Sequence, residues 1–164
     1  MTGEDRPLLT HVDESGAARM VDVSAKDVTV RSATASGFLA TTPDVIELLR
    51  GDGVPKGDAL AVARIAGIQA SKRTPDLVPL CHPVAIHGVV MNLAVMDDGV
   101  AIGATVRTVD RTGVEMEALT CVAVAGLTLI DMIKAVDRSA TLTDVRVEEK
   151  TGGRRGTWRR DAQA

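Results

Sequence analysis

The chain has very few aromatic residues: its 164 residues include one Phe, one Trp and no Tyr. Its core must therefore be built from Val, Leu, Ile, Ala and Met. Nucleic-acid modules that stack bases on exposed rings are excluded for the same reason, so no nucleic-acid partner is expected. In other respects the composition, 45% hydrophobic and 25% charged, is that of an ordinary globular protein. A chain of this length is expected to form a single domain, residues 1–164.

The chain also lacks a CxxC pair, a secretory signal and a long apolar run. Cys81 and Cys121 stand far apart in the sequence, so they form neither a local redox motif nor a local zinc motif. The first residues, MTGEDRPLL, have neither the cationic start nor the apolar stretch of a signal peptide. No uninterrupted apolar run reaches the roughly 18 residues of a membrane span. These absences predict a cytoplasmic protein with reduced thiols and no membrane partner.

The net charge of −3 is unevenly distributed along the chain. Residues 150–164 hold five Lys or Arg and one Asp, a net +4, which leaves −7 on the rest of the chain. The Gly- and Arg-rich segment 151–164 is expected to be a flexible basic tail. Its arginines suit a polyanion such as a triphosphate, although a solubilising disordered end would have the same composition.

Hydrophobic periodicity predicts the order of the elements. Alternating β-branched and polar residues predict strands at 20–23, 28–36, 86–96, 100–109 and 141–148, with a hairpin turn at 97–99. Apolar spacing predicts a short helix within 41–53, an Ala-rich helix over 56–73 that ends before Pro75, and a long helix over 115–136. Without the first strand, this order matches the split βαβ arrangement. The expected fold class is α+β, a ferredoxin-like antiparallel sheet with helices packed on one face.

The long helix over 115–136 has no charged residue between Ala118 and Ile130 and is apolar nearly all round. Such a helix must be buried on every side, and a domain this small cannot cover it alone, so a homo-oligomer is expected. Glu117 and Asp131 share a face of this helix but lie about 21 Å apart along its axis. They can meet in one site only if a second copy of the helix runs antiparallel across a twofold axis.

Two charged pairs on the long helix are candidate site residues, and each has a structural alternative. Asp131 and Lys134 form either an ordinary surface ion pair or an acid–base unit in which the Asp tunes the pKa of the Lys. Glu115 and Glu117 lie in the first turn, where carboxylates commonly complement the helix dipole.

Candidate residues also lie outside the long helix. In PLCHP, Cys81 and His82 are either a buried thiol beside a surface His or, together with a carboxylate, ligands of a metal. Their spacing is not diagnostic of a metal site, and no metal is expected. Lys56 opens the Ala-rich helix, where it either helps backbone N–H groups to hold a phosphate or faces water.

Several stretches, in the order in which they occur, resemble one family. They are THVDESGAARMVDVSAK, KGDALAVARIAGIQASKRTPDLVPLCHP and TGVEMEALTCVAVAGLTLIDMIKAVD, the last followed by EEKTGG. Together they resemble the cyclic pyranopterin monophosphate synthase family, which is the molybdenum cofactor biosynthesis protein C or MoaC family. The resemblance runs from about Leu9 to Gly153, which is nearly the whole chain.

The resemblance implies a ferredoxin-like α+β fold and a homohexamer, built as a trimer of dimers with active sites at the dimer interface. It implies conversion of (8S)-3′,8-cyclo-7,8-dihydroguanosine 5′-triphosphate, a small-molecule substrate made by a radical-SAM GTP cyclase, into cyclic pyranopterin monophosphate with loss of pyrophosphate. No cofactor is implied. The family's catalytic positions fall on Asp131, Lys134 and Lys56, and its substrate-binding positions fall on Leu80, Cys81, His82, Glu115, Met116, Glu117 and Lys150.

A second function class remains compatible with the same fold. A non-catalytic ferredoxin-like regulatory domain would bind a nucleotide and release it unchanged. Turnover of the upstream enzyme's product separates the two hypotheses.

Overall fold

The protein is described by a computed structural model over residues 11–13, 15–51 and 58–161. The strands are β1 (Thr29–Ala40), β2 (Ile86–Val95), β3 (Gly99–Asp110), β4 (Thr141–Thr151) and β5 (Trp158–Arg159). The helices are α1 (Pro43–Arg50), α2 (Ala59–Ser71), α3 (Thr74–Leu77) and α4 (Glu115–Ile133). All strand pairs are antiparallel, and the sheet order is β2-β3-β1-β4-β5. Without β5 this is the split βαβ topology of the ferredoxin-like class, as the sequence predicts.

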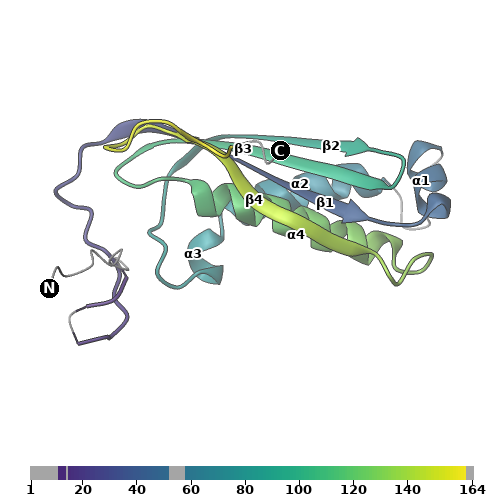
Figure 1. Ribbon diagram of the computed structural model, residues 1–164, viewed down its shortest axis with the longest axis horizontal. Helices are drawn as coiled ribbons and strands as arrows, with labels where there is room; N and C mark the ends of the chain where they lie inside the picture. Colours follow the sequence, from purple (N-terminus) through teal and green to yellow (C-terminus); the bar gives the residue numbers. More distant parts are fainter. Residues whose placement is uncertain (1–10, 14, 52–57, 162–164) are drawn as a thin grey trace, which may run out of the picture.

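The helices cover one face of the sheet, with α4 lying across β1, β3 and β4 and α2 beside it against β2 (Figure 1). Strand β1 shows why: Ala33, Ala35, Gly37 and Leu39 are buried, while the residues that alternate with them are partly exposed. This alternation gives the sheet one apolar face, which the helices bury. The buried apolar residues of the described chain are all Ala, Val, Leu, Ile, Met or Cys, as the shortage of aromatic residues predicts.

Small residues let α4 approach its neighbours closely. A Cβ added at Gly67 of α2 would lie 2.8 Å from the carbonyl oxygen of Cys121 and 2.4 Å from the sulfur of Met91. A Cβ at Gly37 of β1 would lie 2.6 Å from a methyl group of Val122. Gly37 therefore lies within β1 and packs against α4. The expectation that this strand ends at Gly37 is wrong, because the strand continues to Ala40.

Two other expectations about the elements are corrected. The strand predicted at 20–23 is absent: Val21 and Val23 are partly buried, but within the described ranges this segment pairs with no strand. The alternation in sequence reflects the burial of Val21 and Val23 on one side of the segment. Asp22, between them, accepts a hydrogen bond from the backbone N–H of Ser24 at 2.8 Å. The Ala-rich helix ends at Ser71, and Pro75 lies in the first turn of the short helix α3 rather than acting as the terminator.

Helix α4 is long and apolar enough, with a mean hydropathy of 1.8, to resemble a membrane span by length and composition. In this fold it is the central helix of the core, where ten of its residues are buried. It ends at Ile133, slightly earlier than predicted. The sequence predicts no ordered element in the basic tail, whereas the structure places a short strand there, β5.

Asp137 ties the end of α4 to the far end of β1. Its side chain is 4% exposed and accepts hydrogen bonds from the backbone N–H and hydroxyl of Ser139, both at 2.7 Å. It also accepts from the Thr41 hydroxyl at 2.7 Å and from the Thr42 N–H at 3.3 Å. The hydroxyls of Ser139 and Thr41 contribute most to lowering the pKa of Asp137, to about 2.

Replacing Asp137 by Ala is expected to lower the free energy of unfolding at pH 7 by about 2 to 3 kcal/mol, because the buried donors lose a charged acceptor. Since the pKa of this carboxyl lies below its usual value of 3.8, its contribution is complete above about pH 4. The contribution is lost as the pH falls towards 2. Urea titrations at several pH values measure both effects.

The matched control is Asp97→Ala. The Asp97 side chain is 98% exposed and pairs with Arg50 at 2.8 Å, so its loss should cost less than about 1 kcal/mol. Equal destabilisation by the two substitutions would contradict the structural role of Asp137.

Candidate functional site

A cavity of about 590 Å³ lies where the N-terminal segment, the loop before β2, the turn before α4 and the turn after β4 meet. Its polar and charged side chains come from parts of the chain that are far apart in sequence. They are His11, Lys26, Asp27, Thr29, Arg31, His82, Thr112, Lys150, Arg154 and Arg155.

The cavity is strongly cationic. Five Lys or Arg side chains and two His side chains line it, against a single Asp. Thr29 also lines it, and the hydroxyl of Thr29 is, among the described residues, the one buried side-chain polar atom without a hydrogen-bond partner. The concentration of cationic donors along the cavity suits a ligand that carries several negative charges.

Two of the predicted substrate-binding residues, His82 and Lys150, line this cavity. His82 lies in the loop before β2, and Lys150 lies near the end of β4, opposite Ala33 of β1. The Lys150 ammonium is 3.1 Å from a carboxylate oxygen of Glu115, in the first turn of α4. This ion pair joins the cavity to the start of α4.

Glu117, also in the first turn of α4, is almost fully buried, with 3% exposure. Burial, and to a smaller degree the negative charge of Glu115, raises the pKa of Glu117 to about 7. A carboxyl group that titrates near neutral pH can both donate and accept a proton under physiological conditions.

The two thiols lie in the electrostatic field of Glu117. Cys81 is partly buried and Cys121 is fully buried. Burial, together with the charge of Glu117, raises the pKa of Cys81, and the same two causes raise the pKa of Cys121 to about 11. Both groups are therefore neutral thiols at physiological pH and poor nucleophiles.

Asp131 and Lys134 lie at the opposite end of α4. A carboxylate oxygen of Asp131 is 2.7 Å from the Lys134 ammonium, and the two side chains are 59% and 58% exposed. At about 1.5 Å of rise per residue, Asp131 lies about 21 Å from Glu117 along the axis. A single chain therefore does not bring this pair to the cavity.

The remaining predicted site residues are Leu80, Met116 and Lys56. Leu80 is partly buried in the loop before β2, and Met116 is 38% exposed on α4. Lys56 lies outside the described residues. Among the residues that the structure describes, no three His, Cys, Asp or Glu side chains gather in a way that could hold a metal ion.

Sequence reasoning missed three residues of the cavity, His11, Lys26 and Arg31. The sequence contains one weak indication that Arg31 is a site residue, because it is a charged residue within a predicted strand. Its Nε donates to the carbonyl oxygen of Asp110 at 2.9 Å, which holds the side chain at this end of the sheet. His11 and Lys26 come from a segment without regular secondary structure, where spacing carries no information about neighbours.

Comparison with known proteins identifies the family. A family model described as the MoaC family matches residues 20–153. The chain belongs to the MoaC family. A cyclic pyranopterin monophosphate synthase from Streptomyces coelicolor is 64% identical over 169 residues, covering 98% of this chain and 99% of its own. One from Streptomyces griseus is 70% identical over 154 residues, covering 94% and 87%. Cyclic pyranopterin monophosphate synthase 2 from Mycobacterium tuberculosis is 59% identical over 152 residues, covering 93% and 91%.

For this MoaC family member, we expect iodoacetamide to alkylate neither thiol rapidly in the native protein at pH 7, because raised pKa values keep both thiols protonated. Cys81 should become reactive only at a more alkaline pH than an ordinary cysteine, because its pKa is raised, and Cys121 only after unfolding. Mass spectrometry of labelled peptides measures the rates. In urea both thiols should react like ordinary cysteines, and native labelling of Cys81 at that same rate at pH 7 would contradict the assignment.

Proposed function

We propose that this protein is a cyclic pyranopterin monophosphate synthase. It converts (8S)-3′,8-cyclo-7,8-dihydroguanosine 5′-triphosphate into cyclic pyranopterin monophosphate and releases pyrophosphate, a step of molybdenum cofactor biosynthesis. The observation that carries the proposal is the cationic cavity that contains His82 and Lys150, in a chain up to 70% identical to synthases of this name.

The reaction makes two demands that the described residues can meet. Closing a cyclic phosphate while pyrophosphate leaves requires strong neutralisation of phosphate charge, which the lysines and arginines of the cavity supply. Opening the imidazole ring of the guanine and rebuilding it as a pterin requires repeated proton transfers. Glu117, with a pKa of about 7, is suited to these transfers, and His82 and Glu115 can orient the base and ribose.

Asp131 and Lys134 are proposed as the second proton-transfer unit, contributed by another copy of the chain. At about 100° per residue, Met116, Leu127 and Lys134 lie within about 20° of one another on α4. Leu127 is 61% exposed, and Ile65 on α2 is 67% exposed. This apolar surface suits a second copy, and an antiparallel crossing of two α4 helices would bring Asp131 and Lys134 of one chain towards Glu117 of the other.

The remaining assignments follow from family membership. We propose a homohexamer, arranged as a trimer of dimers, in the cytoplasm, fed by a radical-SAM GTP cyclase. Lys56 is assigned to the catalytic groups, and Leu80, Cys81 and Met116 are assigned to the walls of the substrate site. No cofactor is required by the chemistry, because no net oxidation or reduction takes place.

The decisive test is to incubate the protein with the upstream cyclase's product and to detect a fluorescent pterin after oxidation. We expect the parent protein to form it. Lys134→Met should remain folded and oligomeric but lose activity by orders of magnitude, since an exposed ion pair contributes at most about 1 kcal/mol to stability. A substrate that is bound and recovered unchanged would instead identify a non-catalytic nucleotide-binding regulatory domain.

A shared site predicts complementation between inactive variants. Glu117→Gln and Asp131→Asn chains should each be inactive alone, but refolded together they should form some sites that contain both native residues. The recovered activity, corrected for the fraction of mixed oligomers measured by native mass spectrometry, is the readout. Mixed oligomers without activity would show that the two residues act in one chain or not at all.

A further inference from the structure

The second half of β4 departs from a regular strand at Glu148. Thr34 of β1 pairs with Glu149, but the next residue, Ala35, pairs with Val147. Glu148 is thus the extra residue of a β-bulge. Directly opposed residues share a face of a sheet, and an extra residue switches the face of every side chain beyond it.

The bulge sets the face of Lys150 relative to that of Val147. Ala35 and Ala33 are both buried under the helices, and their partners on β4 are Val147 and Lys150. Val147 and Lys150 are an odd number of residues apart, so a regular strand would place them on opposite faces. With Glu148 inserted, Lys150 turns to the helix side, where its ammonium meets Glu115 at 3.1 Å.

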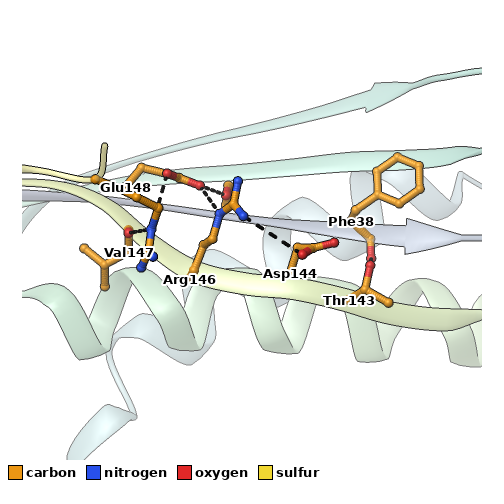
Figure 2. Close-up of polar contacts among 8 residues, drawn as sticks. Phe38, Thr143, Asp144, Arg146, Val147 and Glu148 are labelled. Carbon is orange, nitrogen blue, oxygen red and sulfur yellow. Dashed lines mark hydrogen bonds and ion pairs between the residues drawn. The ribbon is translucent and has the colours of Figure 1, made fainter. Parts of the chain in front are cut away.

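The carboxylate of Glu148 binds three groups. It accepts a hydrogen bond from the hydroxyl of Ser36 on β1. It accepts another from Nε of Arg146 at 2.7 Å, as Figure 2 shows. Its second oxygen is 3.7 Å from Nε of Arg160, beyond β5. Arg146, followed by Ser36, lowers the pKa of Glu148, so the carboxylate is ionised at neutral pH.

Further contacts close the hairpin formed by β4, the turn and β5, here called the C-terminal hairpin (residues 147–160). The N–H of Arg160 donates to the carbonyl oxygen of Glu148 at 2.8 Å, and its Nε donates to that of Val147 at 2.9 Å. Arg159 pairs with Glu149 at 3.2 Å. The guanidinium of Arg160 also lies over the Trp158 ring, 5.7 Å from its centroid.

The turn of this hairpin has a restricted backbone conformation and lies at the cavity. Gly152, Gly153 and Gly156 all have positive φ, which other residues rarely adopt. A Cβ at Gly152 would lie 2.3 Å from the carbonyl oxygen of Val30, so the turn rests directly on β1. The N–H of Gly156 donates to the carbonyl oxygen of Gly153 at 3.1 Å, and between them Arg154 and Arg155 line the cavity.

From this arrangement we propose that Glu148 is a positioning residue of the site: it holds the C-terminal hairpin so that Lys150, Arg154 and Arg155 together bind the phosphate groups of the substrate. The inference rests on the proposed function for the identity of the substrate. The inference adds that this hairpin binds the polyphosphate end of the substrate, and that Glu148, a residue outside the cavity, controls the affinity for that end. Each arginine forms charge-assisted hydrogen bonds only while the hairpin stays closed.

The test compares Glu148→Gln with the parent protein. Anisotropy of Trp158, the one Trp of the chain, reports the mobility of the hairpin, and titration calorimetry with sodium tripolyphosphate reports phosphate binding. We expect lower anisotropy, about tenfold weaker tripolyphosphate binding and a KM raised by a similar factor, with kcat changed less than about twofold, because the proton-transfer groups are untouched.

Two further variants make the result specific. Asp144→Asn is the matched control: it removes a charge from the same strand, 4.0 Å from Arg146, at a residue whose positive φ Asn tolerates. It should behave like the parent protein in all three measurements. Arg160→Gln opens the hairpin from its other side with Glu148 intact and should reproduce the effects of Glu148→Gln. If Glu148→Gln does not fold, the comparison of Arg160→Gln with the parent protein tests the inference by itself.

Two results would overturn the inference. One is parent-like binding of tripolyphosphate by the variants despite a mobile Trp158, and the other is absence of tripolyphosphate binding by the parent protein. Failure of the proposed function looks different: the parent protein would form no pterin, while the effects on anisotropy and tripolyphosphate binding would persist.

Discussion

The packing of α4 across β1, β3 and β4 is the contact on which the rest of the structure depends. It buries ten residues of the helix against the sheet and α2, and glycines at positions 37 and 67 let the backbones approach. Because no aromatic residue is buried in the described core, stability must come from many aliphatic contacts along one long helix. The same contact fixes the direction of α4, so Glu115 and Glu117 lie at the cavity end while Asp131 and Lys134 lie at the other.

Under the proposed function, this geometry would link catalysis to assembly through the cost of burying a charge. Glu117 is buried, no cation among the described residues offsets the cost of its burial, and its pKa is raised to about 7. Lys134, in contrast, is exposed and already paired with Asp131. If a second copy brings Lys134 to Glu117, the attraction between them favours ionisation of Glu117 and offsets part of the desolvation. The protonation state of Glu117 would then depend on assembly, and an isolated subunit would hold half of a proton-transfer chain.

Periodicity in the sequence predicts most of the long regular elements. Strands β2 and β3 and helix α4 lie within a few residues of their predicted positions, because each has a strong pattern over ten or more residues. The strand predicted at 20–23 failed, because alternation reports one-sided burial and not hydrogen bonding to a neighbouring strand. In the site, His82 and Lys150 were predicted through the family resemblance. Arg31 could not be placed beside them, because sequence spacing carries no signal for residues brought together only by the fold.

The least predictable feature is the bulge at Glu148, and it shows why irregular positions matter for the site. A strand pattern assigns each residue to a face by counting in twos, and a single extra residue breaks that count without any mark in the composition. By the regular count from Val147, Lys150 would point away from the helices. Its ion pair with Glu115 exists because the extra residue is there, and Ser36 and Arg146 bind the carboxylate of that residue. The polar network of Figure 2 thus stabilises a local departure from β geometry, and this departure turns a lysine of the sheet towards the cavity.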